Sequence, residues 1–282
     1  MRKTAILAMT GAIGAVLTAA PLLAAETILI LNDGIAATLA FPDGGTLVPA
    51  VLMLHGFGSS RDEVGGLYAQ QAAALEAQGI ASLRIDFQGF GKSDGDTGAS
   101  TIDQQLENAI TGLDALMSTQ GVDPDRIGLM GFSLGGGVAM LIAQSEAITI
   151  KSMVTWSSVG DFEVDMVGTV GQAAFDRAAA EGIVGLDLGW RTIALKQGFF
   201  ESLSGRDLTA AIASFPGAYL AIAGSDDFSA AYVEGFVAAA AGSPKEGLII
   251  PGGDHIFGVF GPDAAMSQGV VSRTAEWFAS TL

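Results

Sequence analysis

Cysteine is absent from this sequence, and its absence excludes several kinds of chemistry. A chain without thiols has no cysteine nucleophile, no cysteine-ligated zinc, no structural disulfide and no lipidated cysteine. Histidine is almost as scarce, because only His55 and His255 occur among the 282 residues. A histidine-rich metal site is therefore not expected, and any chemistry that needs an imidazole must use one of these two side chains.

Basic residues are also few. The sequence has 13 Lys and Arg against 30 Asp and Glu, which gives a formal net charge of −17 at neutral pH. A polyanionic surface repels phosphate backbones and anionic lipids, so we expect no nucleic-acid partner and no anionic membrane partner. Half of the residues are hydrophobic and only 15% are charged, which is typical of a chain with a large buried core.

The first 25 residues have the pattern of a secretory signal peptide. Arg2 and Lys3 form a positive end, residues 5–23 form an apolar stretch with many small side chains, and Ala24-Ala25 supplies a cleavage site. We expect residues 1–25 to be removed and the protein to be periplasmic or secreted, with no membrane contact after removal. The alternative is a retained membrane anchor.

Short apolar runs alternate with helical patterns along the rest of the chain. This alternation predicts an α/β fold with a mostly parallel central sheet and helices on both faces. The expected strands are residues 27–31, 35–41, 50–54, 80–85, 126–130, 151–156, 218–223 and 247–250. The expected core helices are residues 62–78, 101–120 and 264–280.

One stretch departs from this alternation. No strand is evident between Val159 and Pro216, and the apolar residues there favour helices, near 167–181 and 190–203, over a loop of that length. Residues 160–216 are therefore predicted to form a helical cap. The core domain is then built from two segments, residues 26–159 and 217–282.

The segment Gly131-Phe132-Ser133-Leu134-Gly135 fits G-x-S-x-G, the pattern of a nucleophile elbow. An expected strand ends just before it and a helix-compatible run follows, so Ser133 lies where a strand turns sharply into a helix. Glycine fits such a turn because a side chain would clash with neighbouring backbone and because glycine tolerates positive φ. The free N–H groups of the following helix favour negative charge. The alternative is a glycine-rich turn with an incidental serine.

A serine hydroxyl needs a base, and the base needs an orienting acid. The chain order that accompanies this elbow is serine, then acid, then histidine. His255 follows the last expected strand and is interpreted as the base. Asp227 follows the strand at 218–223 and is the predicted acid, with Asp226 and Asp161 as alternatives.

His55 precedes the serine, which is the wrong order for the base, so we interpret it as a structural residue of its loop. That loop follows the strand at 50–54, where an oxyanion-hole amide is needed. The backbone N–H groups of Phe57 and Leu134 are expected to stabilise the developing negative oxygen.

The segment Gly89-Phe90-Gly91-Lys92-Ser93 ends like a phosphate-binding loop, but the motif is incomplete. It requires a glycine five positions before Gly91, where the sequence has Asp86. We expect a turn beside the active site at this position, and no nucleotide site.

Taken in order, these motifs resemble those of the α/β-hydrolase superfamily. The resemblance rests on residues 54–58, 86–95, 131–136, 224–227 and 253–257. Within the superfamily, the Asp-Phe-x-Gly-x-Gly-x-Ser-Asp-Gly stretch and the Gly-x-Asp-His-x-Phe ending look most like the feruloyl and cinnamoyl esterase group. The resemblance implies an α/β-hydrolase fold with a cap inserted after the sixth strand. It also implies a serine esterase without cofactor or metal. Phe132 and Leu134 stand where this group commonly has His and Gln.

The expected function is hydrolysis of small-molecule carboxylic esters through an acyl-enzyme intermediate. The expected substrates are aromatic (cinnamoyl or feruloyl) or short-chain acyl esters, with Phe132, Trp156 and Phe257 lining the acyl pocket. Two alternatives remain open: a serine peptidase or amidase of the same fold, and a non-catalytic binding protein that keeps the fold. The sequence carries no signal for an oligomeric state.

Overall fold

The computed structural model of the chain describes residues 26–44, 46–144, 149–189, 191–261 and 264–282. The expected signal peptide, residues 1–25, lies outside the described residues. Within the described ranges, every helix is too short or too polar to cross a bilayer.

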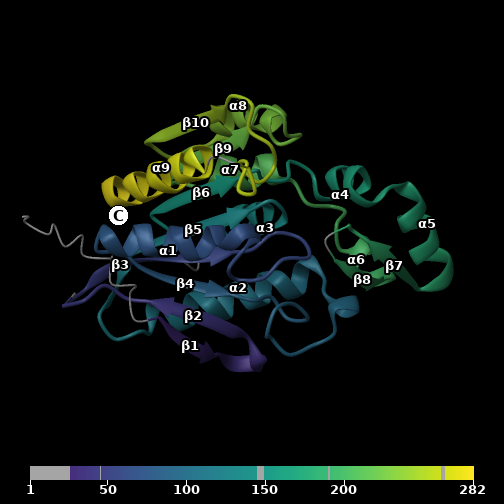
Figure 1. Cartoon of the computed structure of the whole chain (residues 1–282), viewed down its shortest axis with the longest axis horizontal. Helices are drawn as coiled ribbons and strands as arrows, with labels where there is room; N and C mark the ends of the chain where they lie inside the picture. The colour runs from purple at the N-terminus through teal and green to yellow at the C-terminus, as the bar shows by residue number, and fades with distance from the viewer. Residues whose placement is uncertain (1–25, 45, 145–148, 190, 262–263) are drawn as a thin grey trace, which may run out of the picture.

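The described part of the chain is organised around an eight-stranded sheet with the order β1-β2-β4-β3-β5-β6-β9-β10 (Figure 1). Only β2 runs against the direction of the other strands: it is antiparallel to both of its neighbours, β1 and β4, whereas every pair from β4 to β10 is parallel. This arrangement confirms the predicted fold class. The strands are β1 (Thr27–Ile30), β2 (Ala36–Ala40), β3 (Val48–Leu54), β4 (Ala81–Ile85), β5 (Val122–Phe132), β6 (Ser152–Trp156), β9 (Ala218–Gly224) and β10 (Lys245–Ile250).

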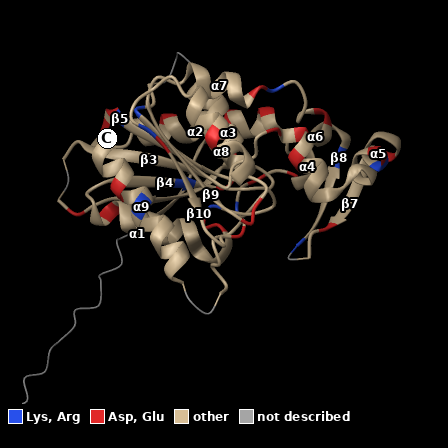
Figure 2. Cartoon of the chain, turned by 90° about the horizontal axis from the view of Figure 1, so that it is seen from above, with Lys and Arg blue, Asp and Glu red and all other residues tan. Residues whose placement is uncertain are grey.

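Helices cover both faces of the sheet, as Figure 2 shows. One face carries α1 (Leu67–Ala77) and α9 (Ala265–Thr281). The other carries α2 (Ile102–Met117), α3 (Leu134–Ala143), α7 (Leu208–Ser214) and α8 (Ala230–Ala239). The central strands are therefore buried on both sides and read as continuous apolar runs instead of alternating ones. Short 3₁₀ turns lie at Asn32–Gly34, Val64–Gly66 and Thr97–Ala99.

The parallel strands direct their following loops to one edge of the sheet. The loop after β3 contains His55 and Phe57, and Ser133 follows β5 directly. Asp227 follows β9, and His255 follows β10. Because carboxyl ends of parallel strands share an edge, residues distant in the sequence meet there, which is where open α/β sheets bind their ligands.

Most of the segment between β6 and β9 lies at one end of the molecule in both views (Figures 1 and 2), whereas its last helix, α7, packs with α3 and α8 over the sheet. It contains α4 (Phe162–Val170), α5 (Gln172–Glu181), β7 (Ile183–Asp187), β8 (Thr192–Lys196) and α6 (Gln197–Glu201), and then leads into α7. The antiparallel pair β7–β8 forms a second, two-stranded sheet. We call residues 160–216 the cap.

The β7–β8 hairpin corrects the expectation of an all-helical cap. The helix expected at 190–203 begins only at Gln197, because the preceding residues form a strand. In that strand Ile193 and Leu195 are buried while their neighbours are exposed, which is the two-residue period of a half-buried strand. The helix expected at 167–181 is two helices, separated at Gly171, whose φ is +81°.

Polar contacts attach the cap to the core. Lys196 pairs with Asp96 at 2.7 Å, and Arg206 pairs with Asp103 at 2.7 Å. The backbone N–H of Ile102, at the start of α2, donates to the cap residue Ser202. The cap is thus held against loops next to the carboxyl edge of the sheet.

Candidate active site

Ser133 occupies a strained turn between β5 and α3. Its φ is +53°, a value that non-glycine residues rarely adopt outside functional sites. The flanking glycines are required by space: a Cβ on Gly131 would lie 2.2 Å from the carbonyl oxygen of Gly135. A Cβ on Gly135 would lie 2.4 Å from the carbonyl oxygen of His55. The turn therefore fixes the serine at the sheet edge, as the elbow pattern predicts.

The structure brings the predicted nucleophile, base and acid together. The Ser133 hydroxyl lies 3.0 Å from Nε2 of His255, and Nδ1 of His255 lies 3.0 Å from Oδ1 of Asp227. Two aromatic rings hold the imidazole from different sides. Phe228 stacks on it at a centroid distance of 5.4 Å, and Phe132 meets it edge-on at 5.2 Å. With Nδ1–H donating to Asp227, Nε2 is free to accept the serine proton.

Asp227 is kept ionised by its contacts. Burial, the largest influence, acts to raise the pKa of Asp227, since its side chain is only 5% exposed. Hydrogen bonds from His255 and Ser229 together with the attraction to His255 outweigh burial, so the net pKa is lowered. A carboxylate that stays charged at neutral pH stabilises the imidazolium that forms when His255 takes a proton.

The alternative acids point elsewhere. Asp226 is exposed and accepts a hydrogen bond from Ser225. Asp161 caps the N-terminus of α4, where it accepts from the backbone N–H groups of Glu163 and Val164. Neither carboxylate has a hydrogen bond to His255.

The expected oxyanion donors, the amides of Phe57 and Leu134, come from the loop after β3 and from the first turn of α3. Leu134 begins the helix, so its N–H has no acceptor inside the helix. Among the described residues, the N–H of Phe57 has no acceptor either. Two backbone donors without protein acceptors beside the Ser133 hydroxyl are the arrangement that an oxyanion hole requires.

His55 holds the loop after β3, which carries Phe57, by hydrogen bonds to backbone groups. Its Nε2 accepts from the backbone N–H of Phe87 at 3.0 Å, so Nδ1 carries the proton and donates to the carbonyl of Gly56 at 2.8 Å. Burial lowers the pKa of His55 to about 4, which keeps the ring neutral. A neutral imidazole with both nitrogens occupied has no free position for base chemistry.

Glu63 is a site residue that sequence reasoning missed. Its carboxylate accepts from the backbone N–H groups of Gly56 and Val64 and from the hydroxyl of Ser59. Burial, the largest influence, raises the pKa of Glu63 despite these hydrogen bonds. Glu63 falls inside the expected helix at 62–78, but the helix begins only at Leu67 and Glu63 itself has a φ of +60°. No periodicity or motif marks such a position.

A cavity of about 910 Å³ opens above Ser133 between the core and the cap. This volume is that of a pocket for a drug-sized molecule. Much of its lining is apolar, with Phe57, Phe132, Met166, Phe228, Ile256 and Phe260 among the lining residues. Phe132 therefore lies where the sequence reading expects a pocket residue.

For Trp156 and Phe257, the prediction that they line the acyl pocket is wrong. Both side chains are completely buried, and they pack edge-on against each other in the core cluster beneath α1 and α9. The indole N–H of Trp156 donates to Thr274 of α9 at 2.8 Å. These two aromatics pack on the face of the sheet that α1 and α9 cover and do not line the cavity.

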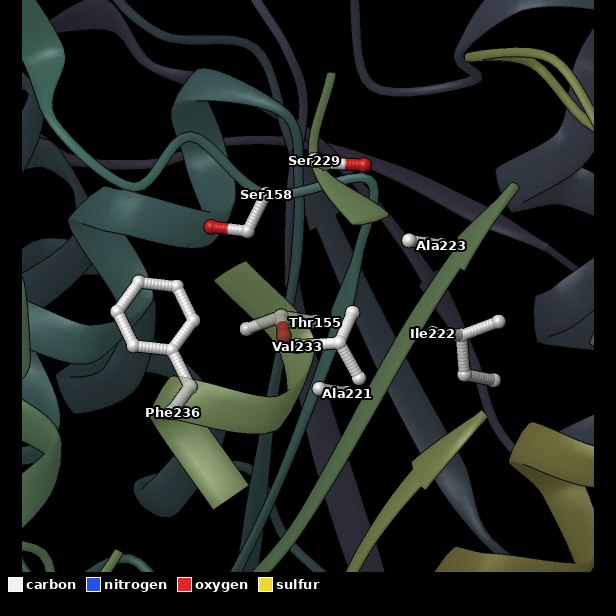
Figure 3. Close-up of a pocket in the computed structure, with 8 residues that line it drawn as sticks. All are labelled: Thr155, Ser158, Ala221, Ile222, Ala223, Ser229, Val233 and Phe236. Carbon is white, nitrogen blue, oxygen red and sulfur yellow. The ribbon is translucent and has the colours of Figure 1, made fainter. Parts of the chain in front are cut away.

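A second, much smaller cavity lies between β6, β9 and α8 (Figure 3). Its volume of about 10 Å³ holds at most about one water molecule. Ser229, the hydrogen-bond partner of Asp227, lies at its rim, and the hydroxyls of Ser158 and Ser229 point away from each other. This cavity is too small for an organic substrate.

The incomplete phosphate-loop motif forms a turn that closes on its own carboxylate. Asp86 accepts from the backbone N–H of Lys92 at 2.8 Å and pairs with Arg61. Gly91 approaches the Asp86 carboxylate so closely that a Cβ there would overlap it, and Gly91 also lines the large cavity.

A family model described as serine aminopeptidase, S33, matches residues 47–185. That range includes Phe57 and Ser133, whereas Asp227 and His255 lie beyond it. An uncharacterized 31.7 kDa protein in the traX-finO intergenic region of Escherichia coli is 31% identical over 143 residues, which make up 51% of this chain and 49% of that protein. The chain thus spans about half the length of these curated relatives.

Solved structures resemble the chain over almost its whole length. Est1E from Butyrivibrio proteoclasticus with ferulic acid bound has a TM-score of 0.72 at 22% identity, covering 90% of this chain and 99% of that chain. Dienelactone hydrolase from Anabaena variabilis has a TM-score of 0.61 at 21% identity, covering 91% of this chain and 98% of that chain. At such identities the likeness establishes the fold.

Proposed function

The chain is an α/β-hydrolase-fold protein, and from that premise we propose that it is a serine hydrolase that cleaves small-molecule carboxylic esters. The observation that carries the proposal is the hydrogen-bonded series Ser133–His255–Asp227 beneath a largely apolar cavity. A serine, an imidazole and a buried carboxylate in this order supply a nucleophile, a base and an orienting acid.

The first half of the reaction forms an acyl-enzyme. Ser133 attacks the ester carbonyl carbon while Nε2 of His255 takes the hydroxyl proton. The carbonyl oxygen becomes negative and accepts hydrogen bonds from the amides of Phe57 and Leu134. Asp227 holds the ring orientation and stabilises its positive charge.

Departure of the alcohol completes the acyl-enzyme, and its hydrolysis then releases the acid. His255 returns its proton to the leaving alcohol oxygen as the carbon–oxygen bond breaks, which leaves the acyl group on Ser133. Water then attacks the acyl carbon with His255 again as base, and the proton passes to Ser133 as the acid leaves. The chain supplies every proton transfer in this cycle.

The cavity supports aromatic or short-chain acyl esters as substrates. Aromatic side chains dominate the wall near the triad, since Phe132 and Phe228 both contact the His255 ring. Flat apolar acyl groups pack well on such surfaces. Est1E, the structurally similar protein with ferulic acid bound, supports aromatic acyl groups as the substrate class.

Amide hydrolysis is the second candidate, because the family model is described as a serine aminopeptidase. The same triad attacks both bonds, so the test compares substrates directly. Purified protein is assayed in parallel with p-nitrophenyl acetate and an aminoacyl p-nitroanilide, with Ser133→Ala as control. We expect hydrolysis of the ester and loss of that activity in the variant. Faster cleavage of the anilide would overturn the ester assignment and support the peptidase.

Export to the periplasm or the medium is also proposed, on the charged, apolar and small-residue pattern of residues 1–25. Fractionation of cells that express the full chain, with N-terminal sequencing of the product, tests it. A processed N-terminus near residue 26 in the exported fraction is expected. Full-length protein that stays membrane-bound would instead indicate a retained anchor.

A further inference from the structure

Arg191 differs from every other arginine that the structure describes. Among the described residues, no carboxylate lies within ion-pair distance of it, in a chain where acidic residues outnumber basic ones by 30 to 13. Each of the others pairs with at least one carboxylate: Arg61 with Asp86, Arg84 with Glu26 and Asp62, Arg126 with Asp123, Arg177 with Glu181, Arg206 with Asp103, and Arg273 with Glu246.

Arg191 is held in the wall of the large cavity. It lies in the cap between β7 and β8, and its Nη1 donates to the carbonyl of Gly58 at 3.0 Å. The guanidinium also lies over the ring of Phe90, at 5.7 Å from its centroid. A guanidinium has five N–H donors, so these contacts leave donors for a ligand. Gly58 adjoins Phe57, so the charge lies beside the expected oxyanion hole.

Among the described residues that line the cavity, Arg191 is the only lysine or arginine. The cavity carboxylates are already satisfied by the protein. Asp165 accepts from the backbone of Gly160 and the hydroxyl of Tyr232, and Asp254 accepts from the backbone of Ile256 and Gly258. Glu63 and Asp227 have the partners described above. An anionic group that enters the cavity therefore meets one cation without a carboxylate partner.

We propose that Arg191 binds a carboxylate of the substrate, so that the favoured substrates are esters that carry a carboxylate besides the ester bond. The proposal rests on the proposed ester hydrolysis and narrows its substrate class. Arginine suits this role because its planar fork matches two carboxylate oxygens and stays charged at any working pH. The alternative role is purely mechanical, as a clamp between the cap and the Gly58 loop.

The test uses two matched pairs of esters, in which a carboxylate replaces a methyl group. In the first pair, p-nitrophenyl hydrogen adipate against p-nitrophenyl hexanoate, the carboxylate is on the acyl side. In the second, m-acetoxybenzoate against m-tolyl acetate, it is on the alcohol side. Arg191→Gln is compared with Arg206→Gln, a control in the cap that loses an ion pair to Asp103 outside the cavity.

For at least one pair, we expect the native protein to prefer the anionic ester. Arg191→Gln should lower kcat/KM for that ester by about 10- to 100-fold more than it lowers kcat/KM for the uncharged partner. Arg206→Gln should keep the native preference. The proposal is overturned if the native protein prefers the anionic ester in neither pair. It is also overturned if Arg191→Gln lowers kcat/KM equally for the anionic and the uncharged ester, as a purely mechanical clamp would.

Binding to Ser133→Ala separates this proposal from the proposed reaction. Calorimetric titration of the same esters onto Ser133→Ala, with and without Arg191→Gln, needs no turnover. Tighter binding of an anionic ester that is lost with Arg191 supports the carboxylate site even if the native protein hydrolyses nothing, in which case only the esterase assignment fails. Equal binding of the anionic and uncharged esters overturns the carboxylate site whatever the protein hydrolyses.

Discussion

The neighbouring residues Asp226 and Asp227 differ in the direction of their side chains, and this direction decides which of them can orient His255. Both follow β9, yet only Asp227 reaches His255, while Asp226 turns to Ser225. Sequence order predicts that an acid comes from this loop, but it cannot decide between adjacent residues. The decision comes from the turn that follows Gly224, where the amide of Asp227 bonds back to the Gly224 carbonyl.

Asp227→Asn is expected to lower kcat for ester hydrolysis by roughly 10³- to 10⁴-fold, because an amide no longer holds the productive tautomer of His255 or stabilises its charged form. Asp226→Asn is the matched control and should keep nearly native activity. Steady-state assays with p-nitrophenyl acetate measure both. Equal losses in the two variants would contradict the assignment of the acid.

The burial of His55 should make the free energy of unfolding depend on pH. Burial lowers its pKa from 6.5 to about 4, so the unfolded chain binds the proton more readily than the folded one. Stability conferred by neutral His55 is present at pH 7 and is lost as the pH falls from 6.5 towards 4. Between pH 7 and pH 5 this single group should cost about 2 kcal/mol of unfolding free energy.

Denaturant titrations of the native protein and of His55→Gln at the two pH values isolate that contribution. The variant should be less stable at pH 7, because it loses the hydrogen bonds to Gly56 and Phe87. Between pH 7 and pH 5, the variant should lose about 2 kcal/mol less unfolding free energy than the native protein loses. An identical pH dependence in both proteins would show that His55 does not titrate as its burial requires.

The loop after β3 is held from two sides, and its position decides whether the amide of Phe57 reaches the expected oxyanion. His55 and Glu63 bind the backbone of Gly56 from the core side. From the cap side, Phe199 of α6 stacks on Phe57 at a centroid distance of 5.5 Å. The oxyanion loop is thus supported by both the core and the cap.

Glu63→Ala removes the acceptor of the Gly56 amide and should displace this loop. We expect kcat to fall by about 10- to 100-fold with little change in KM, because the oxyanion contact strengthens only in the transition state. Glu107→Ala, on the exposed side of α2, is the control and should behave like the native protein. A selective rise in KM in Glu63→Ala would place Glu63 in substrate binding instead.

The elements of the core could be predicted from the sequence because each buried strand reads as an apolar run and each helix has a distinct period. The cap could not be predicted as well. Its strands β7 and β8 are five residues each, too short for the two-residue period to stand out against the helical patterns around them. For the aromatics, Trp156 ends an apolar run and Phe257 lies in the loop that carries His255, and neither position shows on which side of the sheet the ring packs.

The whole molecule carries a strong negative charge. Acidic residues are spread over both helical layers and the cap (Figure 2), and the formal net charge of −17 goes with a sequence pI near 4.2. Like charges keep the chains apart at neutral pH. The negative charge of the protein repels an anionic substrate. A cation in the cavity wall offsets this repulsion locally, and Arg191 is placed to supply that positive charge.

Acidification should remove this repulsion while His55 becomes charged. We expect the protein to stay dispersed at pH 7 and to associate as the pH approaches 4.2, where net charge vanishes and stability has also fallen. Light scattering during a stepwise pH titration follows the association. A solution that stays monodisperse through that range would show that net charge does not control the dispersion of the chains.

Whether catalysis proceeds through Ser133 is tested directly by the site of covalent labelling by a fluorophosphonate. Such a probe phosphonylates only a serine that a neighbouring base activates. Peptide mapping by mass spectrometry should place one label on Ser133, with simultaneous loss of ester hydrolysis. Asp227→Asn should label far more slowly than the native protein. Absence of a label on Ser133, or full hydrolysis of p-nitrophenyl acetate by Ser133→Ala, would contradict a reaction that proceeds through this serine.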